Sequence, residues 1–138
     1  MPFGGLARWP VWRRWFGSRS ERAAARFLRR RGYRVLACNV SLPAGELDLV
    51  ALDGRTLVFV EVRSTEGGDP ERPAASVDAV KQRKLTDLAL AYLHQHRLLG
   101  QPSRFDVLAV SWPPNRREPV IVHYPSAFEA VGRFQMFS

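Results

Sequence analysis

The apolar residues of this chain recur with two different periods, which divides the chain into helical and extended segments. Helical spacing covers about residues 19–32 and 76–97, and a short C-terminal helix is expected near 126–132. Runs rich in β-branched and apolar residues predict five strands, at about 33–40, 46–53, 56–63, 104–111 and 118–123. A loop rich in Gly and Pro covers 64–75. The pattern predicts a single α/β domain over residues 18–138, preceded by a tail over residues 1–17.

Two neighbouring predicted strands carry carboxylates where a chain normally places its core. Residues 46–53 and 56–63 are apolar on both faces, and Asp53-Gly54 between them is typical of a hairpin turn. With a turn of two residues or a loop of four, side-chain alternation puts Glu46, Asp48, Phe59, Glu61 and Arg63 on one face. It puts Leu47, Leu49, Val58, Val60 and Val62 on the other. A three-residue loop would instead separate Asp48 from Glu61.

Buried carboxylates need a cation, and the sequence offers two kinds. Like charges that face each other destabilise a sheet, and a hard divalent cation such as magnesium would relieve this repulsion. Alternatively, Arg63 and other basic side chains simply neutralise the acids. The pattern alone leaves both interpretations open.

The second predicted helix supplies two lysines that belong to this question. Its buried stripe is expected to consist of Val77, Val80, Leu85, Leu88, Ala91 and Tyr92. Lys81 and Lys84 fall within that stripe, although lysine is seldom buried without a partner. They are therefore candidate partners for the strand carboxylates or for a phosphate. The alternative is that both side chains extend from the edge of the helix face into solvent.

Two further acids interrupt apolar segments. Glu21 lies on the apolar stripe of the first helix, where it either contributes to a site or forms a capping box with Ser18. Asp106 interrupts the strand at 104–111, and we expect a structural ion pair with Arg104 or a lysine.

The composition adds a partner class and excludes several kinds of site. The 138 residues include 21 Lys and Arg against 13 Asp and Glu, which gives a net charge of +8. Such a field favours polyanions, either nucleic acid or an anionic membrane surface. The single cysteine, Cys38, excludes an internal disulfide and a cysteine-based zinc cluster, and the three histidines lack a zinc-ligand spacing.

The N-terminal tail offers no membrane span and no secretory signal. Residues 1–17 interleave arginines with tryptophans and contain no acid. This composition suits stacking on nucleic acid or lying on a membrane surface, but such an end is more often a mobile tail, which we favour. No apolar run is long enough to cross a bilayer, and we therefore expect a cytoplasmic protein.

Several motifs together resemble a known family. They are Glu21, Gly45-Glu46-Leu47-Asp48-Leu49-Val50, Val58-Phe59-Val60-Glu61-Val62-Arg63, Val77-Asp78-Ala79-Val80-Lys81 and Arg104-Phe105-Asp106-Val107. Over about residues 17–123 the chain resembles the YraN-like family of uncharacterised bacterial proteins. That family looks like a small member of the PD-(D/E)xK nuclease superfamily and is similar to Holliday-junction resolvases. The resemblance implies a restriction-endonuclease-like core, with a central mixed five-stranded sheet flanked by helices.

The resemblance also implies roles for individual residues. Asp48 and Glu61 match the metal-binding acids, and Glu21 matches an additional acid that the first helix supplies. Arg63 stands where the superfamily pattern has its catalytic lysine. Because arginine cannot be deprotonated in proteins, Arg63 cannot act as a base, although it can hold a phosphate. Lys81 or Lys84 would then supply the missing ammonium.

The leading hypothesis is therefore an endonuclease that uses Mg²⁺ or Mn²⁺ and acts on DNA. In it, Arg63, Lys81 and Lys84 contact the nucleic acid. The alternatives are a non-catalytic nucleic-acid-binding protein on the same fold and an interaction protein that uses residues 1–17. Resolvase-like relatives act as two-fold dimers, so the resemblance also raises a homodimer, for which no surface can be read from the sequence.

Overall fold

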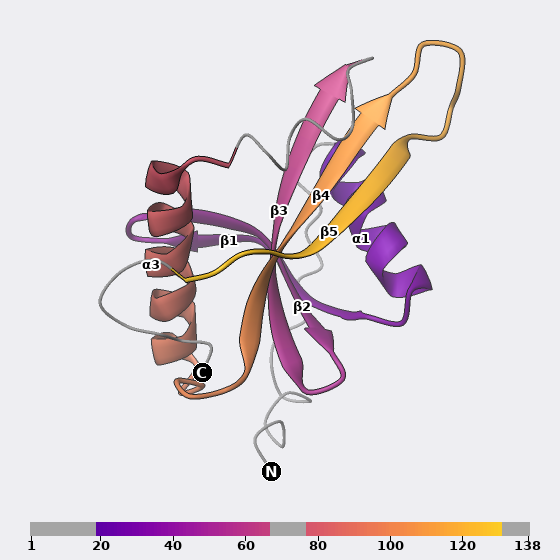
Figure 1. Ribbon diagram of the computed structural model, residues 1–138. Helices are drawn as coiled ribbons and strands as arrows, with labels where there is room; N and C mark the ends of the chain where they lie inside the picture. Colours follow the sequence, from indigo (N-terminus) through magenta and orange to yellow (C-terminus); the bar gives the residue numbers. More distant parts are fainter. Residues whose placement is uncertain (1–18, 67–76, 131–138) are drawn as a thin grey trace.

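A central five-stranded sheet organises the molecule, and the two described helices lie on its opposite faces (Figure 1). The computed structural model describes residues 19–66 and 77–130. The elements in chain order are α1 (Arg19–Arg30), β1 (Arg34–Leu42), β2 (Gly45–Asp53), β3 (Thr56–Glu66), α3 (Ala79–Gln95), β4 (Ser103–Trp112) and β5 (Val120–Phe128). The predicted α/β class and the mixed five-stranded sheet are confirmed.

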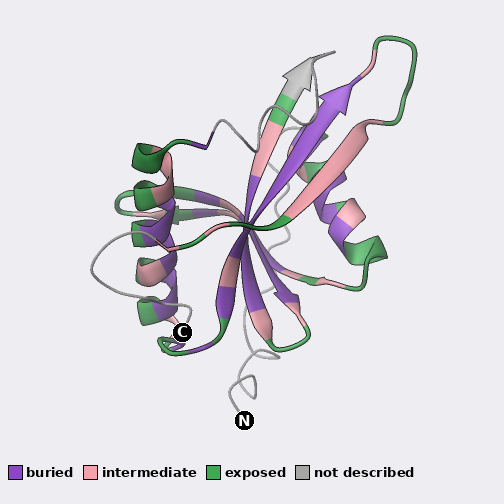
Figure 2. Ribbon diagram, viewed as in Figure 1, coloured by how far each residue is buried: buried purple, intermediate pink, exposed green. Residues whose placement is uncertain are grey.

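The strands lie side by side in the order β1-β2-β3-β4-β5. The pairs β1–β2, β2–β3 and β4–β5 are antiparallel, whereas β3 and β4 are parallel. Helix α3 belongs to the long connection that a parallel pair requires. Strand β4, between β3 and β5, is buried along nearly its whole length (Figure 2).

Helix α1 covers one face of the sheet with small residues. Ala24, Ala25 and Leu28 pack against Leu49 and Val58 of the strands below. Gly32, with φ of 90°, ends the helix as predicted, and the Tyr33 N–H donates to the Leu28 carbonyl oxygen at 3.0 Å. The short alanine side chains let the helix approach the sheet closely. The opposite side of the helix is exposed to solvent.

Helix α3 covers the other face, but with a different stripe from the predicted one. Its buried residues are Leu85, Thr86, Leu88, Ala89, Tyr92 and Leu93. Val80 and Ala91, both predicted to be buried, are exposed. The helix begins only at Ala79, because Asp78 caps it by accepting the Lys81 N–H at 2.9 Å. Val77, Leu85, Leu88 and Tyr92 are buried as predicted, so the stripe was wrong only at Val80, in the first turn of the helix, and at Ala91.

The β2–β3 hairpin has the register that a four-residue loop requires, with Leu52 opposite Leu57. Asp53 also pairs with Thr56, so the tight turn is Gly54-Arg55 rather than the predicted Asp53-Gly54. Gly54 has φ of 61° at the first central position, which is the position of glycine in a type II′ turn. Asp48 and Glu61 therefore share a face, as strand parity predicted.

Three other expectations need correction. Leu47 packs in the cluster on the α3 side, because β2 leaves β3 beyond Leu49 and two-stranded ribbons twist more strongly. Strand β3 continues to Glu66, so the loop predicted from residue 64 starts later. The C-terminal helix expected from residue 126 is wrong at its start, since β5 extends to Phe128 and Ser126 has φ of 51°. The predicted tail over residues 1–17 lies outside the described residues.

Candidate functional site

The Asp48 carboxylate lies where β2 separates from β3. The paired register of the two strands ends at Leu49 and Val60. Two residues beyond Val60 on β3, the Val62 N–H donates to Asp48 Oδ2 at 2.9 Å. A side chain thus satisfies a backbone donor for which β2 provides no backbone partner, and this hydrogen bond fixes the carboxylate at the opening between the strands.

Glu61 and Lys81 complete the centre of the site from β3 and α3. The Glu61 residue is only 9% exposed, because β4 pairs with β3 at this position and Lys81 of α3 lies beside its carboxylate. Lys81 Nζ lies 3.5 Å from Glu61 Oε2. The Asp78 cap holds the backbone of Lys81 in the first turn of α3, so the lysine reaches the strand from a fixed helix start.

The electrostatics of this site are strained. Burial, followed by the charge of Glu61 and a hydrogen bond between the two carboxyl groups, raises the pKa of Asp48 to about 7. The Val62 N–H and the Lys81 ammonium act in the opposite direction but do not outweigh those effects. The buried Glu61 carboxyl and the half-buried Asp48 carboxyl share one partly exposed ammonium, so near neutral pH the site can bind a proton or a further cation.

Arg63 and Lys84, the other predicted phosphate-binding residues, differ in how they lie relative to Glu61. Arg63, half-buried, lies two residues beyond Glu61 and therefore on the same face of β3. Lys84 is exposed, and a Cβ added at Gly45 would lie 3.2 Å from its Cε atom. The aliphatic stem of Lys84 therefore rests on the start of β2 while its ammonium reaches solvent. The structure brings Lys81, and not Lys84, to Glu61.

Glu21 lies on the other side of the sheet. It belongs to α1, and its charge acts on Cys38 of β1, whose thiol pKa is raised to about 11, chiefly by burial. Within residues 19–66 and 77–130 no group of three or more acids, histidines or cysteines forms a metal cluster. Of the three predicted metal ligands, the structure therefore brings together Asp48 and Glu61 but not Glu21.

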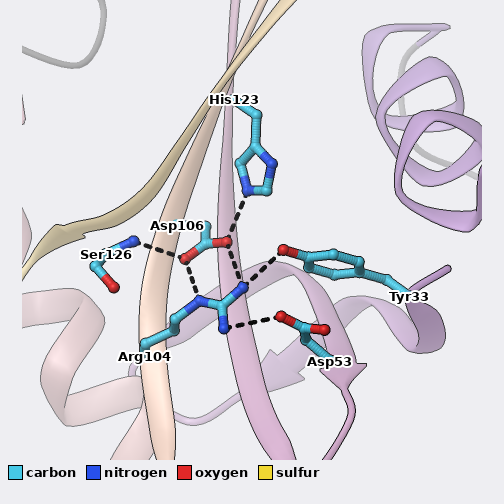
Figure 3. A network of polar contacts seen from close by, with 6 residues as sticks. All are labelled: Tyr33, Asp53, Arg104, Asp106, His123 and Ser126. Carbon is cyan, nitrogen blue, oxygen red and sulfur yellow. Dashed lines mark hydrogen bonds and ion pairs between the residues drawn. The ribbon is translucent and has the colours of Figure 1, made fainter. Parts of the chain in front are cut away.

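A second polar cluster surrounds Asp106, which is completely buried in β4. It consists of Tyr33, Asp53, Arg104, Asp106, His123 and Ser126 (Figure 3). Arg104 Nε lies 3.0 Å from Asp106 Oδ1, and His123 Nε2 lies 2.7 Å from Oδ2. Burial acts to raise the pKa of Asp106, but hydrogen bonds from His123, Arg104 and the Ser126 N–H hold it below its usual value. This carboxylate is fully compensated and ties β4 to β5.

The sequence identified Asp106 and its pairing with Arg104, but not the rest of this cluster. Arg104 also reaches Asp53 Oδ2 at 3.1 Å and the Tyr33 hydroxyl at 2.7 Å. The available signal was a buried acid that needs several donors, since one arginine on the same strand leaves acceptor positions unsatisfied. His123, which has no zinc-ligand spacing, serves here as a hydrogen-bond partner.

Comparison with known proteins assigns the family. The family model described as "Uncharacterised protein family UPF0102" matches residues 20–110. The chain belongs to this family. A UPF0102 protein of Rhodopirellula baltica is 50% identical over 119 residues, covering 84% of this chain and 71% of the relative. A UPF0102 protein of Geobacter metallireducens is 39% identical over 113 residues, covering 82% and 91%.

The UPF0102 match confirms the predicted YraN-like membership and extends across both acids and Lys81. A relative from Symbiobacterium thermophilum, also a UPF0102 protein, is 46% identical over 101 residues, covering 73% of this chain and 86% of its own. Among the described helices of this UPF0102 protein, none is long and apolar enough to cross a membrane.

Proposed function

We propose that this UPF0102 protein binds one Mg²⁺ or Mn²⁺ ion at Asp48 and Glu61 and hydrolyses phosphodiester bonds of DNA. The observation that carries the proposal is the incomplete neutralisation of these two carboxylates. Beside Glu61, Asp48 has a pKa of about 7, so near neutral pH it is only partly ionised. This holds although the Lys81 ammonium lies within ion-pair distance of Glu61.

The residues present fit a hard divalent cation. Carboxylate oxygens are the ligands that Mg²⁺ prefers, and it is commonly held by one or two carboxylates with water and phosphate oxygens completing its coordination. A cation would also replace the proton that Asp48 holds because burial and the charge of Glu61 raise its pKa, since the charge of a bound metal inverts the local electrostatics. Two acids, rather than three, are therefore sufficient for this kind of site.

The side chains around the acids have distinct tasks in this proposal. When bound, the metal would lower the pKa of a water molecule and stabilise charge on the phosphate. Lys81 would orient a phosphate oxygen or the attacking water while remaining near Glu61. Arg63 would hold the scissile phosphate with its fork of donors. Lys84, which is exposed, would contact the nucleic-acid backbone further away. Glu21, on the α1 side of the sheet, is not part of the proposed metal site.

One observation favours a second candidate, a non-catalytic DNA- or RNA-binding protein on the same fold. The position two residues beyond Glu61 holds Arg63, which cannot accept or release a proton at physiological pH. In that case the acids would neutralise lysines or bind a structural cation, and the basic surface would bind the nucleic-acid backbone. The two candidates share their ligand class and differ in turnover.

The decisive experiment combines metal binding with cleavage. Calorimetric titration with Mn²⁺ is expected to show binding to wild type that is lost in Glu61→Gln and Asp48→Asn. Asp87→Asn, which removes an exposed acid from α3, serves as the matched control and should bind as wild type does. Branched and single-stranded DNA are then incubated with each protein and Mg²⁺ or Mn²⁺.

The outcomes separate the candidates. Cleavage that requires Asp48, Glu61 and a divalent metal supports the enzyme. Metal and DNA binding without cleavage by wild type supports the non-catalytic protein, and Arg63→Lys then tests whether a lysine restores turnover. Equal cleavage by all variants would identify a contaminant, whereas equal metal binding in wild type and both acid variants would overturn the proposed site.

A further inference from the structure

The outward side of α1 consists of arginines. Arg19, Arg22, Arg26, Arg29 and Arg30 are all exposed, and they lie opposite the alanines that pack on the sheet. The one acid of the helix, Glu21, falls on the inward half by its helical phase. Arg22, Arg26 and Arg30 follow each other at intervals of four residues, which is about 6 Å along a helix axis. The helix thus presents a continuous row of guanidinium groups.

A groove of about 190 Å³ runs along this row. Arg26 and Arg30 form one side of it, and Phe27 and Ile121 contribute apolar surface. Glu118, in the connection between β4 and β5, adds a carboxylate to the opposite side. The groove is smaller than the roughly 300–1,000 Å³ of a whole small-molecule site, so it suits one small part of a larger ligand.

This surface is separate from the acid site. Helix α1 and helix α3 lie on opposite faces of the sheet (Figure 1), and Lys81 reaches Glu61 from the α3 side. A ligand in the α1 groove therefore does not compete with one at Asp48 and Glu61.

The residues of the α1 surface favour single-stranded nucleic acid over an anionic membrane as the polyanion that binds there. Guanidinium groups match phosphate geometry, often with two parallel hydrogen bonds. A membrane-surface helix would need a free apolar face, but the apolar face of α1 is buried against the strands. Proteins that bind single strands combine a basic track for the backbone with apolar or aromatic surface for the bases. The groove beside Arg26 and Arg30 provides both within one short segment.

We propose that the α1 arginine row and the adjacent groove bind single-stranded nucleic acid, with phosphates on Arg26 and Arg30 and one unpaired base in the groove. Glu118 favours a base edge over a phosphate at its side of the groove, because a carboxylate accepts from exocyclic amino groups and repels phosphate. The inference deepens the proposed function through its ligand class, but it requires neither a metal nor hydrolysis.

The test is fluorescence anisotropy with a short labelled single strand and the matching duplex, without divalent cations. The double variant Arg26→Gln/Arg30→Gln is compared with Arg83→Gln/Arg97→Gln, which removes two exposed arginines from α3 and the turn after it. Losing two phosphate contacts should lower the salt slope by about 1.4 and weaken single-strand binding about 25-fold at about 0.1 M salt. The α3-side variant should stay close to wild type.

Several results would overturn the inference. Equal losses in the two double variants would mean that only overall charge matters, and preference for the duplex would exclude a base in the groove. If the α1 variant loses binding to vesicles with anionic lipids but keeps oligonucleotide binding, the surface belongs to a membrane. Amide chemical shifts of wild type should move near Arg26 and Ile121 rather than near Lys81, which locates the contact independently of any variant.

The binding test can be distinguished from the test of the proposed nuclease activity. Asp48→Asn should keep single-strand binding in this assay even though it loses metal binding. Loss of cleavage therefore tests the acid site, and loss of metal-free binding tests the α1 surface.

Discussion

Removing the negative charge of Asp48 should stabilise the folded protein at alkaline pH. The carboxyl has a pKa of about 7 in the folded protein, against an ordinary value of 3.8. Between these two values the folded state holds a proton that the unfolded chain releases, so stability falls as the pH rises. The loss is complete above the folded pKa, where Asp48 and Glu61 are both charged.

The structure allows the size of this effect to be worked out. A pKa that moves from 3.8 to about 7 corresponds to about 4 kcal/mol at 1.36 kcal/mol per pH unit. Asparagine has the shape of a protonated aspartate, so its amide oxygen can still accept the Val62 N–H and its amide group can donate to Glu61. We expect Asp48→Asn to gain about 2–4 kcal/mol at about pH 8.5 but less than about 2 kcal/mol at about pH 5, because at pH 5 wild type has lost only the part of its stability that falls between pH 3.8 and 5.

Urea denaturation followed by far-UV circular dichroism at both pH values measures the effect. Asp87→Asn is the control, because Asp87 is exposed on α3 and its loss should change stability by less than about 0.5 kcal/mol. If Asp48→Asn is no more stable than wild type at the higher pH, the carboxylates are not under the strain described. A gain of equal size at both pH values would indicate altered packing instead of relieved charge.

Three further predictions follow from the two polar clusters. Lys81→Met should destabilise by less than about 1 kcal/mol near pH 8.5, because Lys81 is 43% exposed, and by less than that near pH 5, where Asp48 holds a proton and only the ion pair with Glu61 is lost; a larger loss near pH 5 than near pH 8.5 in urea denaturation would contradict this account. Mn²⁺ at ten times its Kd should stabilise wild type by about 1.4 kcal/mol in thermal denaturation and leave the stability of Glu61→Gln unchanged. Equal stabilisation of both proteins would mean that the ion binds elsewhere. Asp106→Asn should cost about 3 kcal/mol near neutral pH, because Arg104 and His123 lose their shared acceptor. The loss of stability should shrink as the pH falls below about 4, because wild type then also loses the stability that the lowered pKa of Asp106 provides. A destabilisation of less than about 0.5 kcal/mol in urea denaturation at neutral pH would refute the role of the cluster.

Much of the fold follows from residue patterns because these reflect local physics. Alternation and β-branched runs predicted all five strands, and Gly32 marked the end of α1. The failures occurred where contacts distant in sequence determine the backbone. Ser126 adopts φ of 51° and donates its N–H to Asp106, so the chain continues as β5 where local sequence suggested a helix. Val80 lies on the expected stripe of α3 but in the first turn of the helix, and is 79% exposed.

The candidate site was predictable to the extent that strand parity and helical phase determine it. Parity brought Asp48 to the same face as Glu61, and phase brought Lys81 to that face. The sequence could not distinguish Lys81 from Lys84, because that difference depends on where α3 crosses the strands. Nor could it show that β2 and β3 separate beyond Leu49, which lets the Val62 N–H bind a side chain.

The contrast between the Asp48 and Asp106 clusters supports the proposed function at Asp48. In the sequence, Asp48 and Asp106 look alike, since each interrupts an otherwise apolar strand. Asp106 has Arg104, His123 and a backbone N–H around it, and its pKa is lowered, so its charge stabilises the fold. Asp48 faces a second carboxyl group, and its pKa is raised, so its charge opposes folding. Groups that oppose folding cluster at functional sites, where binding a ligand compensates for the strain. A divalent cation would turn the Asp48–Glu61 repulsion into attraction, whereas the Asp106 cluster has no comparable need for one.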